Sequence, residues 1–207
     1  MTGYFSACPQ DSPAIMGIDG GHHCHPVSRR LVLRAGGAGL AVGLAGCVGG
    51  PGTPAPVALT GGVACDVCGM VIEKHPGPDG QIFYRNQSPA GHDNPARFDS
   101  LKQCFFPYFL EHRQRGWTAT VLYVIDYSAI DYTLQTDAGD TYISSHPEAD
   151  AFAPARDLSY VVGSDIVGAM GPDFIPFTDR TEAVEFAAEH GGRVLAFADI
   201  DEGVIGR

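Results

Sequence analysis

The sequence predicts an α+β protein built from two related small ββαβ-type units with antiparallel or mixed sheets. The order strand, strand, helix, strand can be read in residues 61–126 and again, after a hairpin, in residues 127–207. Each half also contains one segment whose apolar residues follow helical spacing. The 27 Gly and 15 Pro among 207 residues indicate short elements joined by many turns.

The first half begins with residues 81–86, which alternate enough for a strand, and residues 96–98 supply a short partner. Ser100 is a suitable N-cap for the helix that follows. Pro107 lies inside this helix and should kink or split it. Residues 117–126 then read as a strand, because β-branched and aromatic residues dominate them. The apolar helix positions are Leu101, Cys104, Phe105, Tyr108 and Phe109.

The second half repeats this order with strands at residues 158–163 and 174–177 and a last strand at residues 193–200. Asp179 and Glu182 have the spacing of a capping box at the start of its helix. The second half therefore predicts the same ββαβ arrangement as the first.

Two further turn signals complete the predicted fold. His190 followed by Gly191 is a typical helix end, because a basic side chain favours the helix dipole and glycine accepts the left-handed cap. Between the halves, residues 132–137 and 141–144 flank Ala138-Gly139-Asp140, which predicts a β-hairpin.

Composition excludes several classes of protein. Hydrophobic residues make up 44% of the chain, which argues against a wholly disordered protein. The formal net charge of −11 disfavours nucleic acid as a partner, because phosphate binding requires concentrated Lys and Arg. No uninterrupted apolar run reaches the roughly 20 residues that a membrane-spanning helix needs.

The N-terminal region has the pattern of an export signal. Arg29 and Arg30 precede residues 35–46, a short stretch of small and weakly apolar residues, which is typical of twin-arginine export. A buried helix is the alternative, but the many glycines make a poor helix interior. We predict that residues 1–46 are removed, whether translation starts at Met1 or at Met16.

Cys47 ends a Leu-Ala-Gly-Cys sequence that resembles a lipoprotein processing box, so we expect it to carry the lipid. Residues 47–60 would then form a lipidated Gly/Pro tether on the extracytoplasmic face of the cell membrane. Residues 1–46 contain two Asp and three Arg, so the mature chain has 22 acidic and 10 basic residues and a net charge of −12. The metal-like cluster of residues 22–25 would be lost with the signal.

The informative motif is Cys65-Asp66-Val67-Cys68-Gly69-Met70. Two thiolates three positions apart can reach one metal from a tight turn, and Met70 adds a thioether. Soft sulfur ligands of this kind select Cu(I), whereas structural zinc sites usually have four Cys or His ligands. Haem attachment is excluded because Gly69 stands where His is required.

Met170 is the second methionine that the mature chain keeps, and like Met70 it adjoins a glycine. Both precede comparable parts of the two halves, which makes Met170 a further candidate ligand. The alternative for each methionine is that it fills an irregular gap in the core.

Other candidates are weaker. Cys104 lies on the apolar helix face, where a buried small side chain is the more usual interpretation. His75 can complete a metal site but is more typical of a solvent-facing loop. His92, His112 and His146 have no defensible partner spacing. Four carboxylates, none paired for acid–base chemistry, are interpreted as solvated faces or caps: Asp99, Glu111, Asp126 and Asp131.

The sequence resembles the NosL family, the lipoprotein accessory proteins of nitrous oxide reductase, over roughly residues 57–200. The resemblance rests on CDVCGMVI at 65–72 with the HPGP that follows, YVID at 123–126, residues 163–177 and residues 183–197. A longer insertion around residues 88–94 departs from the family pattern.

The resemblance implies two ββαβ-type units, a membrane-anchored periplasmic-type location and delivery of Cu(I) to the copper sites of nitrous oxide reductase. It also implies docking to that enzyme and to the membrane complex of its maturation system. The implied function is therefore a part of denitrification. Cys65, Cys68 and Met70 match the family's Cys/Met motif, and Met170 matches its later methionine.

We therefore hypothesise a Cu(I) metallochaperone rather than an enzyme. One rival is a thiol–disulfide oxidoreductase that uses Cys65 and Cys68, although the glycines around the motif are a poor thioredoxin-like context. The other rival is a structural zinc or metal-sensing module, which Cys104 as a third ligand would favour.

Overall fold

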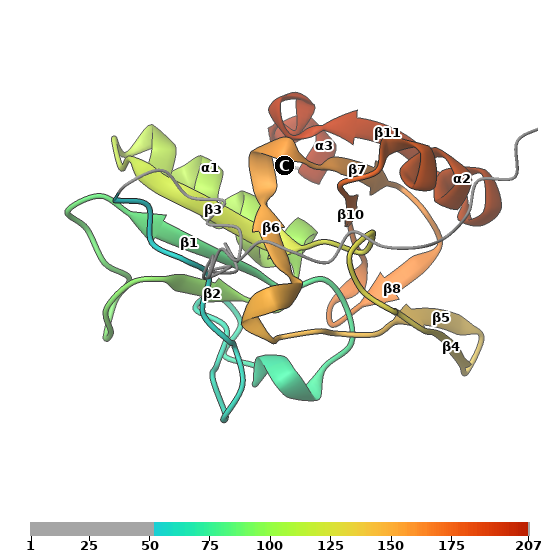
Figure 1. The fold of residues 1–207 in the computed structure, drawn as a ribbon, viewed down its shortest axis with the longest axis horizontal. Helices are drawn as coiled ribbons and strands as arrows, with labels where there is room; N and C mark the ends of the chain where they lie inside the picture. The colour runs from blue at the N-terminus through green and yellow to red at the C-terminus, as the bar shows by residue number, and fades with distance from the viewer. Residues whose placement is uncertain (1–51, 207) are drawn as a thin grey trace, which may run out of the picture. The chain divides into compact units, whose positions relative to one another are not determined.

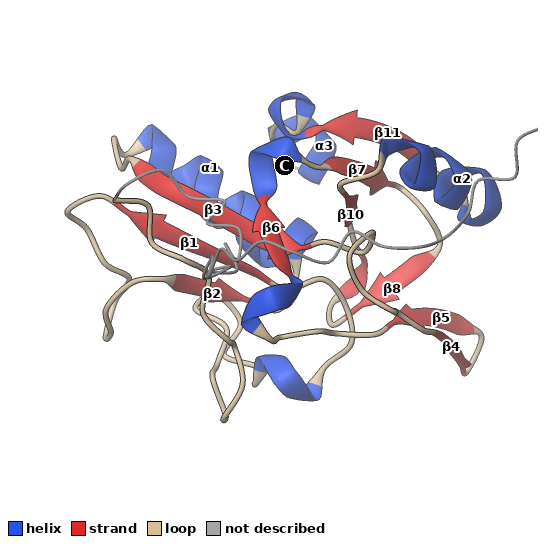
Figure 2. Ribbon diagram, in the orientation of Figure 1, coloured by secondary structure: helices blue, strands red, loops and turns tan. Residues whose placement is uncertain are grey.

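The computed structural model describes residues 52–206 (Figure 1). The predicted export signal, lipidation at Cys47 and the first part of the tether lie outside this range. Within residues 52–206, no helix is long and apolar enough to cross a membrane. The strands form three sheets and are connected by short helices and long loops (Figure 2). This confirms the predicted α+β class with antiparallel and mixed sheets.

The first sheet has the strand order β2-β1-β3-β6, and all neighbours are antiparallel. The helix α1 (Phe106–Gln114) connects β2 to β3. The last strand of this sheet, β6, comes from the second half of the chain, which the sequence did not predict. The bounds are β1 (Gly80–Tyr84), β2 (Ala96–Phe98), β3 (Ala119–Ile125) and β6 (Phe152–Pro154).

The second sheet has the order β10-β7-β11 and repeats the first topologically. In both, the first strand is central, the second lies on one side, and the strand after the helix lies on the other. The predicted ββαβ repeat is therefore present. Its elements are β7 (Ser159–Val162), β10 (Ile175–Phe177), α2 (Arg180–His190) and β11 (Arg193–Ala196).

The third sheet, β4-β5-β8-β9, is mixed, because β5 pairs with β8 in parallel. The predicted hairpin forms β4 (Leu134–Asp137) and β5 (Asp140–Ile143), with positive φ at Ala138 and Gly139 in its turn. The sequence did not predict β8 (Ile166–Gly168) and β9 (Gly171–Pro172), a tight hairpin with Met170 at its turn.

The first helix starts as its sequence suggests. The side chain of Ser100 accepts a hydrogen bond from the backbone N–H of Gln103, so Ser100 is the predicted N-cap. A turn of π-helix, Leu101–Phe105, precedes α1, and Pro107 falls in the first turn of α1. The proline therefore lies at the junction of the π-helical turn and α1, where the helix changes type.

Two local predictions need correction. Asp179 caps α2 by accepting from the backbone N–H of Thr181, but its own N–H donates to the Ser128 hydroxyl instead of Glu182. The last strand ends at Ala196, and the chain continues as a 3₁₀ turn, Phe197–Asp199, and a short helix α3 (Glu202–Ile205). In both places a tertiary contact or packing replaces the local pattern.

A continuous hydrophobic core includes residues of both halves. Phe106, at the start of α1, packs against Tyr160, Phe174 and Phe197 of the second half, with ring centroids 5.5–5.7 Å apart. Aromatic packing thus joins the first helix to the second sheet.

At Gly77 the backbone of a loop lies in contact with the backbone of β8. Its φ is +116°, and a Cβ there would lie 2.7 Å from the Cα of Gly168 in β8. Gly77→Ala is therefore expected to lower the free energy of unfolding by about 2–4 kcal/mol, since strain at positive φ and a backbone clash add together.

The matched control is Gly139→Ala, because Gly139 also has positive φ (+99°), but in the described part of the chain no neighbouring atom lies within 4 Å of the added Cβ. We expect this variant to lose about 1 kcal/mol, from strain alone. Urea denaturation of both variants measures the difference, and equal losses would contradict the close approach of the loop to β8.

Candidate metal centre

The Cys65–Met70 segment forms a tight loop ahead of β1. The N–H of Gly69 donates to the Cys65 carbonyl (3.0 Å), and the N–H of Cys65 donates to the Met70 carbonyl (2.8 Å). Gly69 has φ +78°, a conformation that a side chain would strain. Cys65 and Cys68 therefore both lie in one short turn, as the spacing predicts.

Asp66 attaches this loop to the first sheet. Its N–H donates to the Arg97 carbonyl (2.9 Å), and its carboxylate accepts from the Arg97 N–H (2.7 Å). The other carboxylate oxygen lies 2.6 Å from His92 Nε2, and this pairing raises the pKa of His92. Through the contact between His92 and Asp66, the insertion around residues 88–94 thus helps to hold the Cys65–Met70 loop in place.

Four potential ligand atoms converge at this place. The thiols of Cys65, Cys68 and Cys104 and a carboxylate oxygen of Asp99 all lie within 4.8 Å of one another. Cys104 arrives from the π-helical turn after Ser100, and Asp99 from the end of β2. The Cys68 thiol donates to the Asp99 carboxylate, with the sulfur 3.2 Å from Oδ2. Three thiols and one carboxylate therefore face a common point.

Met170 reaches the same cluster from the other half of the chain. Its sulfur lies 3.5 Å from the Cys104 thiol, and 41% of the residue remains exposed. Met70 is half-buried, and its N–H faces the Cys68 sulfur. The structure thus brings Cys65, Cys68 and Met170 to one region and keeps Met70 in the loop beside them.

The three thiols differ in acidity. The hydrogen bond from Cys104 stabilises the Cys65 thiolate and lowers the pKa of Cys65 to about 7, although burial opposes this. Burial raises the pKa of Cys68 to about 12. The pKa of Cys104 is raised because its proton is held by Cys65. Cys65 is therefore expected to be about half ionised near pH 7, whereas Cys68 and Cys104 remain protonated.

A second carboxylate supports the cluster from the side of the other half. Asp173 accepts hydrogen bonds from the N–H groups of Lys102 (2.7 Å) and Phe174 (2.8 Å). This contact ties the chain before β10 to the turn that carries Cys104. Burial raises the pKa of Asp173 to about 6.

The structure corrects one interpretation at this site and adds a contact to another. Asp99 was expected at a solvated face or cap, but it is fully buried beside Cys68. Cys104 is buried in the core as expected, yet its thiol also belongs to the cluster. The only sequence signal for either was the position of both residues at the start of the helix.

Other candidates lie elsewhere. Asp126 was expected on a solvated face but is buried, and it accepts from the N–H groups of Ser128 and Thr178. Its role is to anchor a turn. Among residues 52–206, the group of converging thiol and carboxylate ligands does not include His75. The cluster at residues 22–25 lies outside the described part of the chain.

Three thiols, a carboxylate and a nearby thioether on a small α+β fold define a candidate soft-metal-binding protein. Comparison with known proteins gives the family: the NosL family model matches residues 56–205, and the chain belongs to this family.

Its relatives include two curated proteins named copper-binding lipoprotein NosL. The protein from Stutzerimonas stutzeri is 30% identical over 72% of this chain and 68% of its own. The protein from Achromobacter cycloclastes is 34% identical over 67% of this chain and 63% of its own. The crystal structure of the copper chaperone NosL from Shewanella denitrificans is similar, with a TM-score of 0.56 and 25% identity over 70% of this chain and 95% of that one.

Proposed function

We propose that the protein is a Cu(I) metallochaperone that delivers copper for maturation of the copper sites of nitrous oxide reductase. The observation that carries the proposal is the convergence of three thiols within 4.8 Å, with the Met170 thioether beside them. Thiolate and thioether ligands are the soft donors that favour Cu(I). The names of the relatives support copper binding and describe no catalysis.

The proposed ligands are Cys65 and Cys68 together with one or both of Met70 and Met170. Cys104 is a further candidate thiol, since its sulfur lies within 4.8 Å of the Cys65 sulfur and 3.5 Å from the Met170 sulfur. The 41% exposure of Met170 leaves one side of the site open to an incoming ligand. Copper can then pass to a partner by stepwise ligand exchange, without a free ion.

The proposed setting is the extracytoplasmic face of the cell membrane. Residues 1–46 direct twin-arginine export and are removed, Cys47 is lipidated, and the partners are nitrous oxide reductase and its membrane maturation complex. The lipoprotein names of the relatives support the membrane anchor. The lipid confines the protein close to a membrane partner, which raises the effective concentration of the two.

The direct test is copper transfer. The anaerobically purified full chain is loaded with Cu(I), mixed with copper-free nitrous oxide reductase and separated, and copper in the reductase is measured. We expect copper to move to the reductase from the loaded chain. A Cys65→Ser/Cys68→Ser double variant treated in the same way controls for free copper, and equal transfer from both proteins would contradict the proposal.

Copper affinity should depend on pH with a change of slope near pH 7. Thiolates bind copper, so protons compete with the metal and affinity falls as pH falls. Above pH 7 Cys65 is already ionised and only Cys68 must lose its proton. The apparent Kd should then rise about tenfold per pH unit of acidification, and more steeply below pH 7, where Cys65 is also protonated. Chelator competition from pH 6 to 9 measures this, and a constant Kd would contradict thiolate coordination.

A structural zinc site is the second candidate, because Cys104 and Asp99 supply the third and fourth donors that zinc requires. Metal analysis of the anaerobically purified protein, comparing its copper content with its zinc content, distinguishes the two kinds of site. The thiol–disulfide oxidoreductase alternative is less well supported, because a turn and then the 3₁₀ segment Ile72–Lys74 follow Cys68, not an α-helix. Turnover of a model disulfide would revive it.

A further inference from the structure

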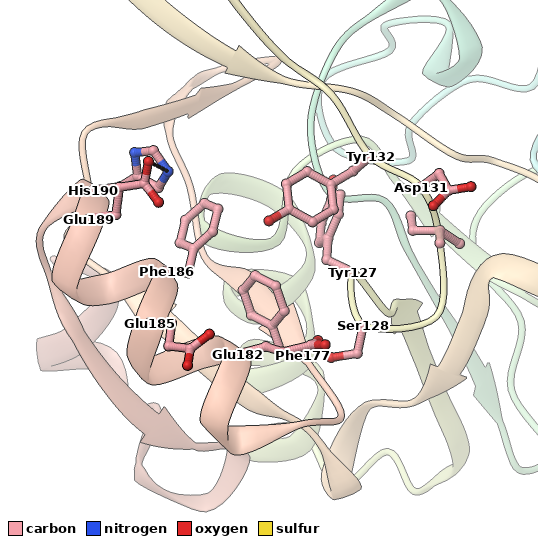
Figure 3. A pocket seen from close by; sticks show the side chains of 11 residues that line it. Tyr127, Ser128, Asp131, Tyr132, Phe177, Glu182, Glu185, Phe186, Glu189 and His190 are labelled. Atoms are coloured by element: carbon pink, nitrogen blue, oxygen red, sulfur yellow. Dashed lines mark ion pairs between the residues drawn. The ribbon is translucent and has the colours of Figure 1, made fainter. Parts of the chain in front are cut away.

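A cleft of about 430 Å³ lies between α2 and the chain segment of residues 127–132 (Figure 3). Among residues 52–206, no cysteine lines this cleft, so it is separate from the candidate metal centre. Figure 3 shows Phe186 of α2 beside Tyr132 of the opposite segment, and their rings pack edge to face with centroids 6.3 Å apart. Four aromatic residues line it, of which Tyr127, Phe177 and Phe186 are buried (1–5% exposed) and Tyr132 is partly exposed.

Carboxylates surround these aromatic residues. Glu182, Glu185 and Glu189 occupy positions i, i+3 and i+7 of α2, so they share one helix face, and Asp131 adds a fourth carboxylate from the opposite segment. None of the residues that line the cleft is Lys or Arg. Within residues 52–206, only Glu189 of these four is near a basic group, His190 Nε2 at 3.9 Å.

This arrangement costs stability in the isolated protein. Like charges at helical spacings of three and four residues repel one another. Burial raises the pKa of Tyr132, and the negative charges of Glu182 and Glu189 raise it further, so the negative potential reaches the aromatic walls. A positive charge in the cleft would relieve the repulsion and would also lie against the negative face of the partly exposed Tyr132 ring.

We propose that this cleft is the docking site for an arginine side chain on the surface of a protein partner. Arginine fits better than lysine, because its planar guanidinium stacks on aromatic rings and bonds two carboxylate oxygens at once. The cleft has room for the apolar stem as well as the charged head, so it is larger than a bare cation needs. Arginine and tyrosine are enriched among interface hot spots, and opposite charges on the two partners give such interfaces their specificity.

The test is an NMR titration of the full ¹⁵N-labelled chain with the peptide acetyl-Gly-Arg-Gly-amide. We expect chemical-shift changes at the amides of Tyr132, Glu185 and Phe186, with a Kd on the order of millimolar, as a single side chain would give. The same peptide with citrulline, which keeps the shape and removes the charge, should cause less than about a fifth of the shifts. Equal shifts with citrulline would overturn the proposal.

Two variants separate this cleft from general attraction to an acidic surface. Glu185→Gln removes one rim charge, and Tyr132→Leu keeps an apolar wall but removes its π face. Each should raise the Kd at least about threefold. Glu148→Gln, an exposed acid outside the cleft, is the matched control and should leave the Kd unchanged. Equal weakening by Glu148→Gln would overturn the proposal.

Choline, titrated in parallel, tests whether the cleft serves a small organic cation instead of a protein partner. Weaker binding of choline than of the arginine peptide supports protein docking, because the guanidinium pairs with carboxylates and choline does not. Tighter binding of choline would overturn the proposal in favour of a small-molecule site.

Discussion

Replacing Cys68 by Ser is expected to raise the Kd for Cu(I) about a thousandfold, equivalent to about 4 kcal/mol. The serine hydroxyl is a harder and far less acidic donor, so it cannot replace a thiolate for a soft ion. Cys68 is only partly buried, and a serine hydroxyl can still donate to Asp99, so the substitution should leave the fold intact. Anaerobic competition with a chromophoric Cu(I) chelator measures the Kd.

Three further variants sort the remaining candidate ligands. Met170→Leu removes a neutral thioether and should raise the Kd by about tenfold, less than loss of a thiolate. Cys104→Ser tests whether the third thiol is a ligand or a support for Cys65. His75→Gln is the control and should leave the Kd unchanged. An unchanged Kd in Cys68→Ser would remove the assignment of the metal centre to this motif.

Sequence reasoning identified the soft-donor loop because its chemistry is local. Cys65 and Cys68 are three residues apart, and a turn through Gly69 is enough to bring their sulfurs together. Cys104 and Asp99 lie more than thirty residues away, and no short-range pattern marks them as partners. The pairing of Asp66 with Arg97 joins the loop to β2 and so brings the start of the helix against the thiols.

The fold shows the same division between local and tertiary information. The strands around both helices follow from alternation and spacing, and the N-caps Ser100 and Asp179 follow from local hydrogen bonds. The parallel pairing of β5 with β8 and the joining of β6 to the first sheet are contacts between distant segments. Short strands such as Gly171–Pro172 form through such contacts, and they are too short for their sequences to show a hydrophobic periodicity.

Phe106→Ala is expected to lower the free energy of unfolding by about 3–5 kcal/mol, a large part of the stability of an ordinary domain. Phe106 is 1% exposed and packs against Tyr160, Phe174 and Phe197, so truncation leaves a cavity between the first helix and the second sheet. Urea denaturation, followed by fluorescence of Trp117 and by circular dichroism, measures the change.

The same experiment tests the predicted division of the chain into residues 61–126 and 127–207. Trp117 is the only tryptophan, so its fluorescence reports the first half, whereas circular dichroism reports all helices and strands. Because Phe106 joins the halves through the core, we expect the two signals to change together, in the wild type and in Phe106→Ala. Phe106→Leu is the matched control and should lose less than about 1.5 kcal/mol, since leucine fills most of the space. Separate transitions in the wild type, or equal losses in the two variants, would contradict a shared core centred on this ring.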